Sequence, residues 1–426
     1  MKKTVLTAFS LIFLIKIGLS QPTTPPIAYY PFDKPAYLVG PTGDSICAAQ
    51  AIDAVFPDGN GSNGVPGTFP PTACSCGVLD GAARFDGIDD SYLFIGPVND
   101  VFTAGDFTIG FYIKPFSATG TQVVLSKQRT DSCGLRDHSM AVFYNYASNK
   151  ITANINETDL FQATVSTRLD EGRCWQYILI MKKNAKLFLY VNGTLRDQDT
   201  SPRRLDLTNK QTLFSIGKPI CPGVEKFYKG DLDELRIYNR ALSDDEILAS
   251  YLRPDMIGNR DTLVYLGNSV QIFTTNSCAK SWNWTPTTDV SDPTIPNPVI
   301  TPTLSTTYRL TFVHAECIAT DTIFIKVIDP DTLDCSKIFI PNAFTPNGDG
   351  RNDRFGISNP FAVPDLISFE IFDRWGGRVF FTDSPNGEWD GTFGNKPVNP
   401  GIFLWRLHYR CQGEEKLRNG SLTILR

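Results

Sequence analysis

Apolar and polar residues alternate along much of this chain, and a repeat of two residues is typical of β-strands with one buried face. Residues 107–114 place Phe, Ile, Phe and Ile at every second position, and residues 187–191 place Leu, Leu and Val in the same way. The second stretch ends at Asn192-Gly193, a pair that favours a tight hairpin turn. The pattern therefore predicts strands over most of the chain.

One helix is predicted. Ser243 and Glu246 have the spacing of a capping box, and apolar residues follow at positions 247, 248 and 252. Gly and Pro, with 33 and 29 residues among 426, are at the level of turn-rich β proteins. The expected fold class is all-β: a jelly-roll sandwich followed by two small β-sandwich domains.

Residues 1–20 have the pattern of a secretory signal peptide. Lys2 and Lys3 precede an apolar run over 5–17, and Gly18 and Ser20 are small residues before the expected cleavage site. No other apolar stretch reaches the ~18 residues that a membrane span needs, so no membrane span is expected. Loss of the three lysines in this segment changes the formal net charge from -5 to -8. This acidity argues against nucleic acid as a partner.

Ten cysteines are expected to form disulfides, because an exported protein meets an oxidising environment. Along the chain they divide into sets of six, two and two: Cys47, Cys74, Cys76, Cys133, Cys174 and Cys221, then Cys278 and Cys317, then Cys335 and Cys411. This partition predicts pairing closed within three domains. The expected bridges are Cys278–Cys317, Cys335–Cys411 and three pairs among the first six, whose connectivity the sequence leaves open.

Four motifs in the first half resemble, in order, the strands of LamG-like domains with the concanavalin A-like jelly roll. They are ARFDGIDDSY (83–92), FTIGFYIKP (107–115), LYVNGTL (189–195) and KGDLDELRIYNRALS (229–243). The resemblance implies two stacked antiparallel sheets over 27–253. It also implies a sheet face or rim that binds an extracellular glycan or protein.

The segment 257–330 resembles the PKD-like or immunoglobulin-like modules of bacterial surface proteins. The resemblance rests on SWNWTP (281–286) and STTY (305–308). A spacer is the expected role of this segment, because no unusual polar cluster occurs in it.

The segment 335–426 closely resembles the gliding motility-associated C-terminal domain, the type B sorting domain of type IX secretion. The motifs are IPNAFTPNGDGRNDRF (340–355) and IFDRWGGRVF (371–380). Alternating Phe403, Trp405, Leu407 and Tyr409 are expected to form the core face of one strand. The resemblance implies recognition by the type IX secretion machinery and a location outside the cell, secreted or on the outer cell surface.

Five carboxylates are the candidate metal ligands: Asp86, Asp89, Asp90, Asp231 and Asp233. The first three fall in a turn between strands, and the last two begin a late strand that the jelly roll can bring nearby. Calcium takes six to eight oxygen ligands, so Ca²⁺ is the cofactor that such a cluster would hold. The alternative is that Asp86 and Asp90 bind amides of their own turn, and that Asp233 satisfies a strand end.

No catalytic residues are assigned. The three histidines fall in separate contexts, and Asp231-Leu232-Asp233-Glu234 lacks the Glu-x-Asp-x-x-Glu spacing of laminarinase-like enzymes, because Arg236 stands three residues after Asp233. We therefore expect a secreted cell-surface binding protein or adhesin. The alternative is a hydrolase that acts on polysaccharide through jelly-roll carboxylates. Exposed Tyr144, Tyr146 or Tyr177 would suit a glycan platform, whereas Trp175 is expected in the core.

Overall fold

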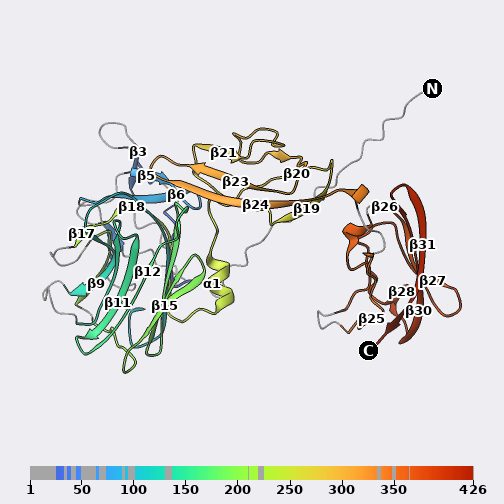
Figure 1. The fold of residues 1–426 in the computed structure, drawn as a ribbon. Helices are drawn as coiled ribbons and strands as arrows, with labels where there is room; N and C mark the ends of the chain where they lie inside the picture. The colour runs from blue at the N-terminus through green and yellow to red at the C-terminus, as the bar shows by residue number, and fades with distance from the viewer. Residues whose placement is uncertain are drawn as a thin grey trace. The chain divides into compact units, whose positions relative to one another are not determined.

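In the computed structural model β-strands supply nearly all of the regular secondary structure (Figure 1). Its described residues are 25–32, 36–39, 45–48, 64–66, 73–88, 92–94, 101–129, 137–209, 211–218, 225–332, 337–347, 352–363 and 365–425. Within them there is one α-helix, α1 (Asp244–Ser250), which begins with the predicted capping box of Ser243 and Glu246. The all-β prediction is confirmed. The predicted signal peptide lies outside the described residues.

The contacts within the chain group it into two compact units. The first unit consists of Met1–Met256, Thr274–Trp282 and Thr311–Asp321, and the second of Ile257–Phe273, Asn283–Leu310 and Thr322–Arg426. Two short segments of the predicted spacer thus pack with the jelly roll. The boundaries 27–253, 257–330 and 335–426 stay predictions.

Two eight-stranded sheets form the jelly roll and face each other (Figure 1). The first sheet has the order β15-β14-β13-β8-β18-β6-β5, with β1 beside β18. Its strands are β1 (Ala28–Tyr30), β5 (Ala73–Cys76), β6 (Gly81–Asp86), β8 (Phe107–Pro115), β13 (Gln176–Lys183), β14 (Lys186–Val191), β15 (Thr194–Thr200) and β18 (Lys229–Tyr238). The predicted Asn-Gly turn joins β14 to β15, with both turn residues at positive φ.

The second sheet has the order β12-β11-β10-β9-β16-β7-β4, with β17 beside β9. Its strands are β4 (Gly64–Pro66), β7 (Tyr92–Phe94), β9 (Thr121–Arg129), β10 (Ser139–Asn145), β11 (Lys150–Thr158), β12 (Phe161–Arg168), β16 (Thr212–Ile216) and β17 (Lys226–Phe227). A separate hairpin pairs β2 (Ala36–Val39) with β3 (Ser45–Ala48). The edge strand β12 is protected from further pairing, because Asp197 and Asp199 of β15 accept hydrogen bonds from its amides.

The apolar faces of the two sheets bury each other. The alternating residues 107, 109, 111 and 113 of β8 are fully buried in this layer, as are Ile151 and Ala153 of β11. Side chains between these positions must point to the opposite faces of the sheets, because successive residues of a strand alternate in direction. The period-two pattern thus defines both the core and two outer faces.

Helix α1 covers part of the outer face of the first sheet. The rings of Tyr112 and Tyr177 pack there with centroids 4.7 Å apart and planes tilted by 34°, in one apolar cluster with Ile247 and Tyr251. The hydroxyl of Tyr177 donates to Ser250 Oγ at 2.8 Å. Burial raises the pKa of Tyr177 to about 12. These tyrosines support the fold and are not surface groups.

The disulfide prediction is wrong for Cys76, Cys174, Cys278 and Cys317, whereas the predicted Cys335–Cys411 bridge stays a prediction. Cys76 bonds Cys278 and Cys174 bonds Cys317, so both bridges join the jelly roll to segments of the predicted spacer. The reason is that 274–282 and 311–321 pack in the same compact unit as the jelly roll, whereas the prediction assumed that each domain closes on its own cysteines. Cys411 is disulfide-bonded, but Cys335 lies outside the described residues, and so do the side chains of Cys47, Cys74, Cys133 and Cys221.

The segment after the helix forms a four-stranded sheet of order β19-β24-β23-β21 and a two-stranded ribbon. The strands are β19 (Thr262–Tyr265), β20 (Val270–Gln271), β21 (Ser281–Thr285), β22 (Val299–Ile300), β23 (Thr306–Val313) and β24 (Ile318–Ile328). Trp284 is buried, and its indole donates to the carbonyl of Ile295 at 3.0 Å. The PKD-like assignment stays a prediction.

The C-terminal domain contains a five-stranded sheet of order β25-β31-β30-β26-β27 and a small ribbon. The strands are β25 (Ala343–Phe344), β26 (Asp365–Phe372), β27 (Arg378–Thr382), β28 (Thr392–Phe393), β29 (Lys396–Pro397), β30 (Gly401–Cys411) and β31 (Glu414–Ile424). The predicted core face of β30, which is Phe403, Trp405, Leu407 and Tyr409, is buried as expected.

We expect the double variant Cys76→Ala/Cys278→Ala to have a free energy of unfolding about 2–5 kcal/mol lower than the wild type. The bridge joins residues 202 positions apart, and removing it frees a long loop in the unfolded chain. Denaturant titration under non-reducing conditions measures the difference. Equal stabilities would show that this bridge does not constrain the fold.

Candidate functional site

The predicted calcium ligands do not form one cluster of free carboxylates. Asp86 ends β6 in an exposed position, and its Oδ1 accepts the amide of Ile88 at 2.7 Å, as in an Asx turn. Asp89 and Asp90 lie outside the described residues. Asp231 and Asp233 lie on β18 and are fully buried.

The Asp231 carboxylate is held by two cations on the outer face of the first sheet. Arg84 Nε lies 2.8 Å from Oδ1, and Lys114 Nζ lies 2.8 Å from Oδ2. The hydrogen bond to Asp231 raises the pKa of Arg84. Lys114 also lies over the ring of Trp175, which is buried as predicted. Asp231 is thus the anion of a buried ion-pair network.

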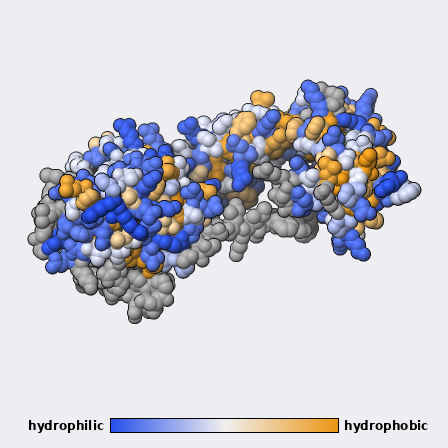
Figure 2. Space-filling view, turned by 90° about the horizontal axis from the view of Figure 1, so that it is seen from below, coloured by the Kyte–Doolittle hydropathy of each residue, from blue (hydrophilic) through white to orange (hydrophobic). Residues whose placement is uncertain are grey.

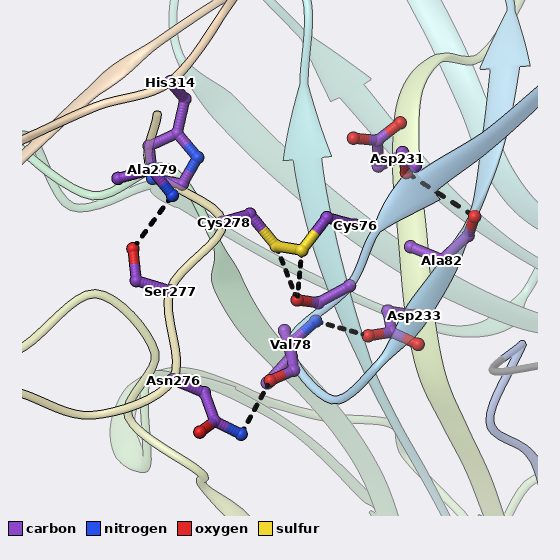
Figure 3. Close-up of a disulfide and its surroundings, with 12 residues drawn as sticks. Cys76, Val78, Ala82, Asp231, Asp233, Asn276, Ser277, Cys278, Ala279 and His314 are labelled. Atoms are coloured by element: carbon purple, nitrogen blue, oxygen red, sulfur yellow. Dashed lines mark hydrogen bonds between the residues drawn. A yellow bond between two sulfur atoms is a disulfide. The ribbon is translucent and has the colours of Figure 1, made fainter. Parts of the chain in front are cut away.

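The Asp233 carboxylate fixes the loop between β5 and β6 (Figure 3). Its Oδ2 accepts the amide of Val78 at 2.6 Å, beside the Cys76–Cys278 disulfide. A Cβ at Gly77 would lie 2.5 Å from the same Oδ2 and 1.9 Å from the carbonyl oxygen of Gly81. Only glycine therefore lets the loop approach this carboxylate.

A calcium ion does not fit the described part of the predicted set. An ion at Asp231 would have to displace two cations, and an ion at Asp233 would have to displace a backbone amide. Calcium binding therefore stays a prediction that these contacts disfavour.

A second group with metal-ligand chemistry occurs among the described residues. The ligand atoms of Cys174, His314 and Cys317 all lie within 4.8 Å of one another. The two cysteines are joined in a disulfide, so they offer no thiolate to a metal. His314 Nε2 lies 3.1 Å from Asp255 Oδ1, which also accepts the hydroxyl of Ser277 at 2.6 Å. In a nucleophilic triad the histidine lies between the serine and the carboxylate. Here Asp255 lies between Ser277 and His314, so these three residues do not have that order.

The outer face of the second sheet carries neutral polar side chains. One row crosses five strands, from β16 to β12, and consists of Ser215, Ser126, Ala141, Asn154 and Thr164. These positions alternate with the buried core residues of the same strands, so they point away from the core. The two serine hydroxyls lie 3.1 Å apart.

Two further rows flank the first. On one side Ser139, Asn156 and Gln162 are cross-strand neighbours, and the amide of Asn156 donates to the Ser139 hydroxyl at 3.2 Å. On the other side the neighbours are Phe143, Thr152 and Ser166. None of the three rows contains a charged residue. We call these rows the polar face.

Part of the polar face is accessible. Phe143, Thr152, Asn154 and Ser166 are half-buried, and Thr164 is exposed. Hydroxyl and amide groups both donate and accept hydrogen bonds, and the Phe143 ring supplies an apolar surface beside them. Such a surface has the chemistry to bind a polyhydroxylated, uncharged molecule.

The polar face was missed from the sequence. Its signal was the polar half of the alternation over 150–158, where Thr152, Asn154 and Asn156 separate the buried Ile151, Ala153 and Ile155. Of the aromatic residues that the sequence suggested as a platform, Tyr144 and Tyr177 are buried, and Tyr146 has 42% of its surface exposed. The face becomes visible only when strand register joins β9, β10, β11, β12 and β16.

We expect Asp231→Ala to lower the free energy of unfolding by roughly 3–5 kcal/mol, because it leaves Arg84 and Lys114 without their anion in a buried site. Thermal or denaturant unfolding measures the loss. Asp86→Ala is the matched control, since this carboxylate is exposed, and its effect should be much smaller. Equal effects of the two substitutions would contradict the role of the ion-pair network.

We expect millimolar calcium chloride to leave the melting temperature of the wild-type protein unchanged, because the described carboxylates are already engaged. Differential scanning calorimetry with and without a chelator measures this. A rise with calcium that is lost in Asp86→Ala would restore the predicted calcium site.

Within the described residues no helix is long and apolar enough to cross a membrane. Two family models match the chain. Residues 86–248 match the concanavalin A-like lectin/glucanases superfamily, and residues 338–424 match the CHU_C type IX secretion signal domain. A search of curated proteins found no match.

Solved structures that resemble the chain include carbohydrate-binding proteins and a toxin domain. The CBM40 of Ruminococcus gnavus IT-sialidase is 19% identical and has a TM-score of 0.36, with 41% of this chain and 98% of that chain covered. Domain 4 of AbnA, a GH43 extracellular arabinanase from Geobacillus stearothermophilus in complex with arabinotriose, is 16% identical with a TM-score of 0.37, covering 53% and 98%. The receptor binding domain of botulinum neurotoxin C/D mosaic serotype is 10% identical with a TM-score of 0.40, covering 69% and 72%.

These TM-scores are too low to carry an inference about function. The family matches agree with the strand order and with the disulfides, which are typical of proteins outside the cytoplasm. The chain therefore carries a concanavalin A-like domain at 86–248 and a type IX secretion signal domain at 338–424, and it is a secreted, extracellular protein.

Proposed function

We propose that this protein binds a neutral polysaccharide outside the cell through the polar face of its jelly roll. The observation that carries the proposal is the polar face itself: adjacent outward positions on five strands hold hydroxyl, amide and small apolar side chains without a charge. Its members on β9 and β16 are buried, whereas its members on β12 and several on β10 and β11 are accessible. A solvated sheet face usually carries charged residues, so the neutral composition of this accessible part calls for an explanation.

Sugar hydroxyls need partners that donate and accept hydrogen bonds at short spacing. Thr152, Asn154 and Thr164 supply such groups on neighbouring strands about 5 Å apart. The ring of Phe143 lies in the row next to Asn154 and can stack on the apolar face of a pyranose. Small ligands usually bind in enclosed pockets. An open sheet surface of this kind therefore suits an extended polymer chain better than a small ligand.

The absence of charge from the three rows favours a neutral sugar. Recognition of a carboxylate or sulfate requires Arg or Lys, which bind acidic groups through charge-assisted hydrogen bonds. Two cations, Lys150 and Arg168, are cross-strand neighbours one row farther along β11 and β12, at the margin of the polar face. An acidic polysaccharide would have to contact these two cations. The binding test therefore includes acidic polymers beside the neutral ones.

The three carboxylates of β18 do not support the hydrolase alternative. Glycosidases place two carboxyl groups across the scissile bond. Asp231, Asp233 and Glu234 lie on the first sheet and are buried among ion pairs and backbone amides, away from the polar face. We therefore propose binding without cleavage. A protein retained on the outer cell surface by its secretion domain would use this binding as an adhesin.

We expect Phe143→Ala and Asn154→Ala each to weaken binding of the preferred neutral polysaccharide roughly five- to tenfold, because one loses a stacking surface and the other a hydrogen-bond pair. Affinity electrophoresis or calorimetry with xylan, β-glucan, arabinan, pectin and alginate measures this.

Gln198→Ala is the control for these variants, because Gln198 is exposed on β15 of the other sheet. It should bind like the wild type. If the protein bound only pectin or alginate, and lost this binding when Lys150 and Arg168 were replaced, the proposal of a neutral ligand would be contradicted. Unchanged binding in Phe143→Ala and Asn154→Ala would contradict the assignment of the site.

A further inference from the structure

The turn between β26 and β27 in the secretion domain is closed by a carboxylate and by backbone hydrogen bonds. We call residues 373–377 the hairpin tip. Asp373 Oδ1 accepts the backbone amides of Trp375 and Gly377, each at 2.8 Å. The backbone of Asp373 also pairs with Gly377 and Gly376, at 2.8 and 3.1 Å. Four hydrogen bonds therefore fix five residues.

Three of the five residues have a structural reason to be present. Asp373 supplies the carboxylate that closes the turn. Gly376 has φ +85°, a conformation that other residues rarely adopt, and a Cβ at Gly377 would lie 3.0 Å from the Asp373 carboxylate. Arg374 and Trp375 have no such reason: both are exposed, and neither side chain forms a hydrogen bond or an ion pair within the described part of the chain.

All six tryptophans lie in the described part of the chain, and among them Trp375 is the exposed one. Its surface is 86% exposed, whereas Trp175, Trp284, Trp389 and Trp405 are buried and Trp282 is half-buried. A rigid turn that presents an indole to water does not gain stability from it. Exposed tryptophan and arginine are, however, the residues that most often dominate protein–protein binding.

Apolar residues continue from the hairpin tip onto the adjoining sheet. Leu404 of β30 pairs with Phe372, three residues before Trp375, and Ile402 lies two residues farther along. Both side chains point away from the domain core, with 54% and 66% of their surfaces exposed. Figure 2 shows orange patches on the right-hand part of the molecule, where Figure 1 places β26 to β31.

We propose that the hairpin tip, with Ile402 and Leu404 beside it, is the surface by which a protein of the type IX secretion machinery recognises this domain. This inference rests on the secretion assignment of 338–424 and is independent of glycan binding. Trp375 would enter an apolar pocket of the partner, and Arg374 would meet carboxylates at its rim. Asp373 is a positioning residue that holds the indole in place before binding.

A protein partner is favoured over a lipid surface by the single cation and the fixed geometry. A lipid-binding segment relies on several basic residues and a broad apolar face. Among the described residues at and beside the tip, Arg374 is the cation without an ion pair, since Arg378 pairs with Glu370 at 2.9 Å. One rigid indole beside one arginine suits a shaped pocket.

The test uses the full chain, expressed in a bacterium that has type IX secretion. We expect Trp375→Ala to lower the exported fraction about tenfold or more, with the protein retained in the periplasm, because truncation of a central tryptophan removes most of the binding. Immunoblots of medium, surface-proteolysed cells and periplasm measure the fractions. Asp373→Ala, which keeps the indole but frees the turn, should give a smaller loss.

Phe393→Ala and Leu417→Ala are the matched controls. Each removes an apolar side chain of similar exposure (60% and 59%) from the same domain, and neither residue belongs to the hairpin tip. Both controls should be exported like the wild type. Trp375→Ala should also keep the wild-type melting temperature and polysaccharide binding when purified, which separates this test from that of the proposed function.

Three results would overturn the proposal. Normal export of Trp375→Ala would show that the hairpin tip is not recognised. An equal loss in Phe393→Ala or Leu417→Ala would show that recognition is not centred on it. Flotation of the wild type, but not of Trp375→Ala, with phosphatidylethanolamine–phosphatidylglycerol vesicles would assign the indole to a membrane surface.

Discussion

The apolar layer between the two sheets of the jelly roll determines the rest of this structure. Every strand that contributes to the layer must place alternate side chains on an outer face. The two outer faces then differ. On the first sheet α1 covers part of the surface, and Asp231 and Lys114 are buried on this face, so the Asp231 carboxylate must pair with Lys114 and Arg84. On the second sheet the three rows of the polar face are neutral and hydroxyl-rich, and Lys150 and Arg168 lie at their margin.

Because the two outer faces differ, polar residues that the fold requires can be told apart from polar residues that are available to bind a ligand. A buried charge costs free energy unless a partner compensates it, so the ion pairs around Asp231 are explained by folding alone. Neutral hydroxyls and amides on a partly accessible face have no comparable structural role. The same reasoning applies to the hairpin tip, where Asp373, Gly376 and Gly377 are explained by the turn and Trp375 is not.

Local patterns predicted the elements of this fold well. The alternation in β8, the capping box at Ser243 and the core face of β30 all follow from residues close together in sequence. The disulfides and the polar face could not be predicted from such local patterns, because they depend on segments far apart in the sequence. Cys278 bonds Cys76 only because 274–282 packs with the jelly roll. The polar face likewise requires the register of five strands, which no single motif contains.

A crystal structure of the protein with an oligosaccharide of its preferred neutral polysaccharide would show directly whether the polar face is the binding site. We expect the sugar rings on β10, β11 and β12, with one ring against Phe143 and hydroxyls bound to Asn154 and Thr152. A sugar on the first sheet, around Asp231 and Asp233, would contradict this expectation.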